Sequence, residues 1–529
     1  MQLRNRVALP IALSTLLFLV GCGSSSNKVT PPPGGGFDNT NMNGTYVFST
    51  LGTDSGGYPI SIAGAFTACG CSGGTISGGT FTFNDGQVGV VSAQTISGGS
   101  YNVTADGRGQ AHLSNSTILG TVTLDFVLAS TNGGSVTEYD TNGTGSGTLE
   151  LQSSVSQSDL ANSYAFLISG VGSNGLFATA GAMTLDANGD ATTGLQDVTS
   201  LNTTTGIASS QTGLSISTSS SVLVGTGTAP GTAQISSAAG LFTFDVYPVD
   251  ATHLKFVETD GLIYGAGDVF TQQSALPSGT IAFTMAGADT TLLPLAVGGL
   301  LPSSSGTISS GIEDYNDGGV ANSATNVSGG FTSLSGGRAL LTLNGFENGA
   351  TNNVLGNYAF AAYPSTGGTF LLEIDDGGIT AGIALAQSTT SFAATQGYGM
   401  NLSAINLSGS TPFEEDDIAE FTSTSSALNG LIDFNDEGTI TFGQTFNASY
   451  TSLSTGRYQL TSNDLNGVFY TVDGTSVLFL ETDDLQVGGG SFLAQSATTS
   501  QMGALARRSA IARVPVFRAG LRQKRARAK

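Results

Sequence analysis

The chain has 529 residues, enough for several domains, and contains 76 Gly, no Trp and only 10% charged residues. All 38 Asp and Glu lie between Asp38 and Asp484, a stretch with only four basic residues, so its net charge is −34. Such a surface repels nucleic acid and anionic lipid head groups, which excludes a nucleic-acid-binding role. It attracts cations or basic partners, and it also favours solubility of an exported protein.

The N-terminus has the pattern of an export signal. Arg4 and Arg6 precede an apolar run, Val7–Val20, that is too short to span a bilayer. The run closes on Leu19-Val20-Gly21-Cys22, which resembles the lipobox of bacterial lipoproteins. The resemblance implies a signal peptide at residues 1–21, cleavage before Cys22 and acylation of that cysteine. The alternative is a plain signal peptide with a chance cysteine.

Residues 22–41 predict a flexible tether, with a Ser/Gly segment followed by Pro31-Pro32-Pro33 and three glycines. In lipoproteins, Asp at the second mature position retains the protein at the inner membrane, and here Gly23 occupies that position. The resemblance therefore implies a lipid-anchored protein of the outer membrane, on its periplasmic face or at the cell surface.

From residue 42 the chain repeats itself. Val, Ile, Leu, Phe and Tyr recur at every second position, which predicts β-strands throughout. A strand ending in an acidic pair recurs, and each copy is followed by a Gly-containing turn and a strand that ends in Gln. The acidic strands are Val136–Asp140, Phe256–Asp260, Leu371–Asp375 and Phe479–Asp483, and the glutamines are Gln152, Gln272, Gln387 and Gln495.

This period, 108 to 120 residues between glutamines, is the size of a small domain. We expect an all-β fold of four tandem antiparallel β-meander barrels or sandwiches of about 110–120 residues each. The predicted repeats are residues 42–155, 156–276, 277–389 and 390–499. The alternative arrangement pairs the repeats into larger two-sheet sandwiches.

Two further markers recur within the repeats. One is a hairpin turn, at Phe83–Gly86, Leu185–Gly189, Tyr315–Gly318 and Phe434–Gly438. The other is a Gly-Arg step at Arg108, Arg338 and Arg457, which the second repeat replaces with Gly231-Thr232.

Because a buried carboxylate needs a partner, we predict the structural ion pairs Arg108–Glu138, Arg338–Glu373 and Arg457–Glu481. The alternative for these arginines is a ligand anchor in a barrel mouth. In the second repeat Glu258 has Lys255 nearby, and its pairing stays open.

The remaining motifs give weak signals for chemistry. Cys69 and Cys71 are the thiol pair that remains after Cys22, and export predicts a disulfide between them. Asp186, Asn188 and Asp190 faintly resemble a calcium loop, but the expected Gly and Glu are missing, so a hairpin turn is the preferred interpretation. Glu414–Asp417 is interpreted as a solvated loop, and the separate His112 and His253 do not predict a zinc site.

The sequence predicts no catalytic residues and no cofactor, and a unit repeated four times argues against one enzymatic site. Residues 500–529 carry nine Lys and Arg and no acid, which predicts a flexible basic tail or one that docks on acidic surfaces. We expect a non-catalytic envelope protein with a structural, spacer or adhesive role. The alternative is a binding protein for small molecules, glycans or calcium, with barrel mouths as sites. Expected partners are the membrane, through the lipid anchor, and envelope polymers, glycans or other surface proteins.

Overall fold

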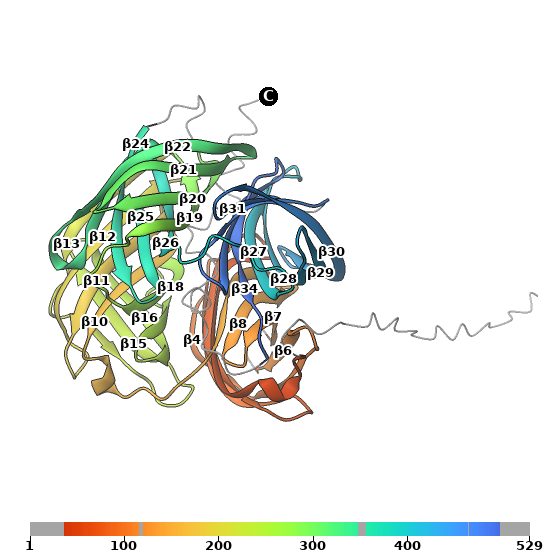
Figure 1. Ribbon diagram of the computed structural model, residues 1–529. Helices are drawn as coiled ribbons and strands as arrows, with labels where there is room; N and C mark the ends of the chain where they lie inside the picture. The colour runs from red at the N-terminus through yellow and green to blue at the C-terminus, as the bar shows by residue number, and fades with distance from the viewer. Residues whose placement is uncertain (1–35, 116–119, 347–355, 464, 498–529) are drawn as a thin grey trace, which may run out of the picture.

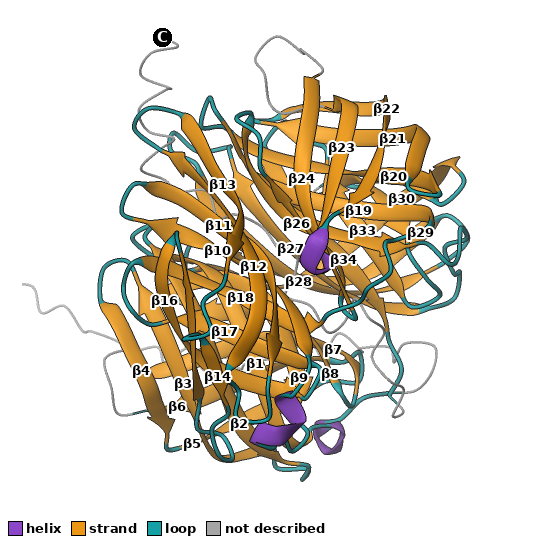
Figure 2. Ribbon diagram, turned by 90° about the vertical axis from the view of Figure 1, so that its left-hand side faces the viewer, coloured by secondary structure: helices purple, strands orange, loops and turns teal. Residues whose placement is uncertain are grey.

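The computed structural model describes residues 36–115, 120–346, 356–463 and 465–497 (Figure 1). Cys22, the predicted signal peptide, most of the tether and the basic tail lie outside these residues. The described part is all-β, with strands in four sheets and three short 3-10 helices, Asn39–Asn41, Gln157–Leu160 and Ser335–Gly337 (Figure 2). The predicted all-β fold of repeated barrel-like units is therefore confirmed. Among the described residues, no helix is long and apolar enough to cross a membrane.

Each sheet is built from consecutive strands and is called a unit below. Unit 1 contains β1 (Asn43–Asp54), β2 (Pro59–Cys69), β3 (Thr75–Asp85), β4 (Gly89–Ile96), β5 (Gly98–Val103), β6 (Arg108–Ser114), β7 (Thr121–Ser130), β8 (Gly133–Asp140) and β9 (Gly143–Leu151). Unit 2 contains β10 (Ser163–Gly172), β11 (Gly175–Leu185), β12 (Ala191–Asn202), β13 (Ile207–Ser215), β14 (Ser221–Leu223), β15 (Gly231–Ser237), β16 (Gly240–Asp250), β17 (His253–Glu258) and β18 (Ile263–Thr271).

The last two units have eight strands each. Unit 3 contains β19 (Gly279–Asp289), β20 (Pro294–Ser304), β21 (Thr307–Asp317), β22 (Val320–Ser333), β23 (Ala339–Phe346), β24 (Gly356–Ser365), β25 (Gly368–Glu373) and β26 (Gly378–Ala386). Unit 4 contains β27 (Gly397–Asn406), β28 (Phe413–Ser423), β29 (Ala427–Asp436), β30 (Thr439–Ser454), β31 (Arg457–Thr461), β32 (Asn466–Thr471), β33 (Ser476–Glu481) and β34 (Gln486–Ala494).

All four units share one antiparallel meander in which the first strand pairs with the last. Units 3 and 4 are closed barrels, and unit 1 closes because β3 pairs with both β2 and β5. The sheet of unit 2 does not close, and β13 and β14 are its two edge strands. These two short strands take the place of the single long fourth strand of units 3 and 4, which pairs with the third strand along one half and the fifth along the other. Closure leaves few strand edges exposed.

Residues on both faces of the barrel wall are buried. Along β33, Val477 and Phe479 point into the core inside unit 4, whereas Leu478 and Leu480 join a second core outside it. Each unit has its own interior core, and the outer core combines residues of units 2, 3 and 4 with Ala129 of unit 1. A strand with two buried faces has a nearly continuous apolar sequence, and β33 is an example.

The four units form a closed ring in the order 1-2-3-4-1 (Figure 1). Unit 1 packs on unit 2 through β1 and β2 against β16, β17 and β18, and unit 2 packs on unit 3 through β10, β11 and β12 against β24, β25 and β26. Unit 3 packs on unit 4 through β19, β20 and β21 against β33 and β34. Unit 4 returns to unit 1 through β27 and β28 against β7, β8 and β9.

Candidate functional site

The repeated arginines lie at the junctions between units. Arg338 of unit 3 donates from Nε and Nη2 to Asp197 of unit 2, at 2.6 and 2.8 Å. Arg457 of unit 4 binds Asp314 of unit 3 in the same bidentate way, with Nε 2.7 Å from Oδ2. In each pair a tyrosine hydroxyl of the arginine's own unit, Tyr363 or Tyr470, also donates to the aspartate. Such forked pairs fix geometry as well as charge.

The ring closes on a third arginine. Arg108 of unit 1 donates from Nη1 to Asp433 of unit 4 at 2.7 Å and from Nε to Asp106 of its own unit at 3.1 Å. Asp125 lies next to this pair, and burial together with Asp433 raises the pKa of Asp125 well above its ordinary value. This junction therefore neutralises its carboxylates with one arginine and with retained protons.

Each repeated arginine therefore pairs with an aspartate of another unit, and the predicted glutamate partners are wrong. These predicted pairs are Arg108–Glu138, Arg338–Glu373 and Arg457–Glu481. Side chains alternate between the two faces of a strand. On β31, Leu460 points into the core of unit 4, so Arg457, three residues earlier, points outward, whereas Glu481 shares the inward face of Phe479. Arginine and glutamate of one unit thus lie on opposite faces of its wall, and the arginine reaches the next unit.

The predicted glutamates are buried on the inner face. Relative exposures are 1% for Glu138, 3% for Glu373 and 0% for Glu481, and burial raises the pKa of each well above its ordinary value. Glu373 accepts a hydrogen bond from the Thr380 hydroxyl at 2.8 Å. A raised pKa favours the protonated, uncharged form of each carboxyl, and that form needs no arginine inside the barrel.

A polar side chain on the third strand of each unit holds the acidic strand of the next. Asn84 Nδ2 donates to the Glu258 carbonyl at 3.0 Å, and Thr199 Oγ1 donates to the Glu373 carbonyl at 2.7 Å. Asn316 donates to the Glu481 carbonyl at 3.3 Å, and Asn435 returns to the Glu138 carbonyl at 2.8 Å. The order of these contacts, unit 1 to 2 to 3 to 4 to 1, repeats the order of the ring.

The recurring glutamines make a second set of contacts with the same order. The side-chain amide of each donates to a backbone carbonyl of the following unit: Gln152 to Pro248 at 2.7 Å, Gln272 to Gly336 at 3.2 Å, Gln387 to Thr471 at 2.7 Å and Gln495 to Asp106 at 2.7 Å. A Cβ placed on Gly107, Gly337 or Gly456 would lie 2.2 to 2.6 Å from the amide nitrogen of one of these glutamines. The glycine of the Gly-Arg step therefore leaves room for the incoming glutamine.

The junction between units 1 and 2 lacks the arginine and uses other groups. Thr82 donates to Asp245 at 2.5 Å and lies 3.0 Å from the hydroxyl of Tyr247. Nearby, His253 bridges Glu150 and Asp268 at 3.1 and 2.9 Å, and Lys255 Nζ lies 3.2 and 3.3 Å from the same two carboxylates. This cluster could not be predicted from the sequence, because its members come from β9, β17 and β18 of two units.

This cluster is a buried, internally neutralised group. Burial opposes ionisation of Glu150, yet the charges of His253 and Lys255 lower its pKa. Burial likewise opposes protonation of His253, yet Glu150 and Asp268 raise its pKa. These shifts favour the charged forms of His253, Lys255 and Glu150, which lie between β9 of unit 1 and the sheet of unit 2.

The other predicted residues lie in turns and strands. Cys69 and Cys71 form a disulfide at the end of β2. Asp186 Oδ1 accepts the backbone N–H groups of Asn188 and Asp190, at 2.8 and 3.0 Å, so the carboxylate is occupied by the β11–β12 turn. Within the described ranges, no three His, Cys, Asp or Glu residues are grouped to hold a metal ion.

The run Glu414–Asp417 is not a solvated loop as expected. It lies in β28, and all four residues are buried. Glu415 and Asp417 share the inward face of Ala419 and Phe421, whereas Asp416 faces outward to unit 1. Thr144 of unit 1 donates to Asp416 at 3.0 Å, and burial together with Glu415 and Asp436 raises the pKa of Asp417 well above its ordinary value.

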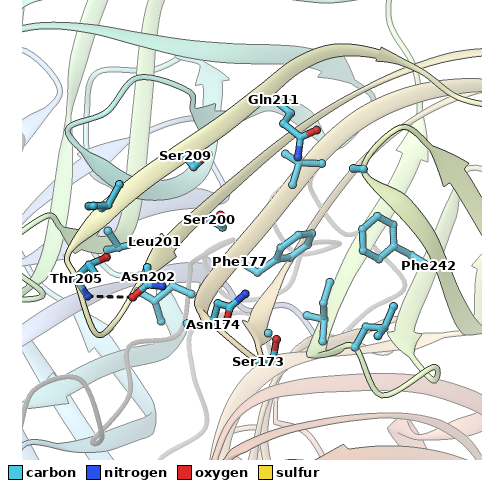
Figure 3. Close-up of a pocket in the computed structure, with 18 residues that line it drawn as sticks. Ser173, Asn174, Phe177, Ser200, Leu201, Asn202, Thr205, Ser209, Gln211 and Phe242 are labelled. Atoms are coloured by element: carbon cyan, nitrogen blue, oxygen red, sulfur yellow. Dashed lines mark hydrogen bonds between the residues drawn. The ribbon is translucent and has the colours of Figure 1, made fainter.

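The mouth of unit 2, whose sheet is not closed into a barrel, carries a cavity of about 580 Å³ (Figure 3). It lies in unit 2, between the β10–β11 turn, the β12–β13 hairpin and the residues around β16 and β18. Phe177 and Phe242 pack against one another in its lining, with Gln211 on one side and Ser173 and Asn174 on the other (Figure 3). The predicted arginine and glutamate positions do not line this mouth.

Comparison with known proteins gives no family. No family model and no curated protein matches the chain. Among solved structures, a mutant of the vaccine antigen transferrin binding protein B from Haemophilus parasuis Hp5 is 9% identical, with 86% of this chain and 96% of that chain covered and a TM-score of 0.18. A double mutant of that protein is 10% identical, with coverage of 70% and 82% and a TM-score of 0.17. Intact Ap-TbpB, with N and C lobes, is 7% identical, with coverage of 93% and 98% and a TM-score of 0.18. Likeness at this level carries no functional argument.

Proposed function

We propose that this chain is a lipid-anchored cell-envelope protein whose four units act together as one rigid, non-catalytic display body. The observation that supports this best is the return of unit 4 onto unit 1 through Arg108–Asp433, Asn435 and Gln495. A spacer made of independent domains would need no such contacts. Ring closure buries both faces of the wall strands that lie at the junctions, such as β33, and holds every unit in a fixed orientation.

The anchoring part of the proposal rests on the sequence. Cys22 takes the lipid, and the segment from Cys22 to residue 35 holds the body away from the membrane. The predicted tether ends earlier than residue 41, because Phe37 is buried in the core of unit 1 and Asn39–Asn41 form a 3-10 helix against it. The acidic body repels anionic head groups. The body then presents its loops to envelope polymers or to proteins at the cell surface.

Metabolic labelling with an alkyne palmitate analogue tests the anchor. The full chain, expressed in a Gram-negative host, should incorporate the label and fractionate with the outer membrane. Cys22→Ala should abolish labelling, and Cys69→Ala with Cys71→Ala should leave it unchanged. Labelling that persists in Cys22→Ala, or a wild-type chain free in the periplasm, contradicts the proposal.

A further inference from the structure

The mouth of unit 2 is lined by uncharged residues although the chain around it is strongly acidic. The lining combines apolar side chains with amides and hydroxyls and contains no Asp, Glu, Lys, Arg or His. Its volume, about 580 Å³, lies within the range of small-molecule sites. A charged ligand would lose its hydration there without gaining a partner, which favours a neutral one.

Two aromatic rings form the apolar wall. The rings of Phe177 and Phe242 have centroids 5.6 Å apart and planes tilted by 47° (Figure 3). Phe242 is buried and Phe177 is half-buried, so their positions are set by packing. The faces of such rings carry partial negative charge and attract the weakly positive C–H groups of a ligand ring.

Polar groups lie at the rim on both sides of these rings. Asn174, Gln211 and Ser209 are exposed around the cavity. Amides and hydroxyls can each donate and accept, which matches the hydroxyl groups of a sugar. The rim is held in place because Asn202 accepts the backbone N–H groups of Thr204 and Thr205, at 2.9 and 3.0 Å, within the β12–β13 turn.

We propose that the mouth of unit 2 is a binding site for a neutral mono- or disaccharide. One sugar face stacks against the half-buried ring of Phe177, which packs on the buried Phe242, and the hydroxyls bind the amides of Asn174 and Gln211. A purely apolar ligand would not use the polar rim, and an acidic sugar would find no cation in the lining. This site goes beyond the proposed display role and does not depend on it.

Saturation-transfer NMR on the full chain in mild detergent tests the site, with cellobiose, maltose and N,N′-diacetylchitobiose as probes at about 20 mM. We expect at least one of them to receive saturation. Phe177→Ala and, separately, Gln211→Ala should each weaken its binding about tenfold or more. Gln211 is exposed, so that variant should fold even if Phe177→Ala does not. Tyr58→Ala, an exposed aromatic of unit 1, is the matched control and should bind normally.

Three outcomes overturn the proposal. The first is no transfer to any of the three sugars. The second is binding that survives both variants, which places the sugar elsewhere. The third is binding of the apolar probe 1-naphthol that depends on Phe177 while no sugar binds, which assigns the mouth to an apolar ligand.

Discussion

At the residue scale, the junction arginines are anchors between units. Asp314 is fully buried, and its carboxylate is held by Arg457 and by the hydroxyl of Tyr470. A buried ion pair contributes modestly by itself, but removing one partner leaves an uncompensated charge. These residues therefore control whether neighbouring units stay together more than they stabilise one barrel.

Removal of one such arginine gives the first prediction. Arg457→Ala should lower the free energy of unfolding by about 3–5 kcal/mol, because Asp314 stays buried without its cation. Urea titration followed by circular dichroism measures this, since the chain has no Trp. Adding Asp314→Asn should restore part of the loss. A loss below about 1 kcal/mol would mean that the pair behaves as a surface bridge.

The buried carboxyls predict a dependence of stability on pH. Burial raises the pKa of Glu415 to about 7, that of Glu420 to about 8 and that of Glu258 to about 9. In the unfolded chain glutamate loses its proton near pH 4.5, so between that pH and these values the folded chain holds more protons. Stability should therefore fall as pH rises from about 5 to 9.

Thermal unfolding across this range checks the prediction, and the melting temperature should be highest near pH 5. Glu415→Gln should reduce the slope between pH 5 and 7, because the amide mimics the protonated acid and cannot ionise. Melting temperatures that rise steadily towards pH 9 would contradict the raised pKa values.

Which residues recur could be predicted from the sequence, but their partners could not. The acidic strands, the glutamines and the Gly-Arg steps all mark conserved positions of one repeat within this chain. The pairing of Arg108 with Glu138 is predicted because both recur in the same repeat, but Arg108 binds Asp433 of another unit. Whether two side chains on neighbouring strands share a face depends on the register of the strands. A register shift of one residue moves a side chain to the other face of the sheet.

At the element scale, the Gly-Arg step is a contact between two units. Gly337 has φ +72°, and the amide nitrogen of Gln272 lies 2.2 Å from where its Cβ would stand. Gly261 has nearly the same φ, +74°, with nothing within 4 Å of that position. The two glycines therefore separate the cost of left-handed backbone from the cost of losing the junction contact.

Alanine at these two positions gives the third prediction. Gly261→Ala should cost about 1 kcal/mol, from the backbone conformation alone. Gly337→Ala should cost about 1 kcal/mol more, because Gln272 must move away from the Gly336 carbonyl. Urea denaturation of both variants measures the difference. Equal costs would show that the glutamine contact does not stabilise the junction.

Alternation of apolar residues was enough to predict strands and barrels, since period two places one face inside. This alternation does not predict a strand where acidic residues are buried on both faces. It also does not locate the hairpin turn of a repeat whose strand order differs from the others. Glu414–Asp417 lacks apolar residues, which predicts a loop, although it is part of strand β28. In unit 2 the sequence predicts the turn equivalent to Phe434–Gly438 at Leu185–Gly189, whereas the third and fourth strands meet at Asn202–Gly206.

At the scale of the whole molecule, the ring makes each unit dependent on two neighbours. The side chains at the junctions repeat with one direction around the ring. The fourth junction joins residues far apart in the sequence, such as Asn435 and Glu138, which are 297 positions apart. Such contacts could not be predicted from the sequence, because nothing in a tandem repeat says whether its ends meet. Closure is thus the property that most directly distinguishes this body from a flexible array.

A single cut in the chain tests closure. A protease site inserted between Ser274 and Ala275, both exposed and outside the strands, would separate units 1 and 2 from units 3 and 4 after cleavage. In a ring the two halves still share two junctions, the 2–3 and the 4–1, so they should elute together at the size of the intact chain. In a linear array a single junction would remain.

Combining the cut with Arg108→Ala and Arg338→Ala, which remove one arginine anchor at each of the shared junctions, should release the halves. Combining it with Arg457→Ala, whose 3–4 junction lies within one half, should not. Size-exclusion chromatography of the cleaved proteins distinguishes these cases, and separation of the halves after the cut alone would contradict the closed ring.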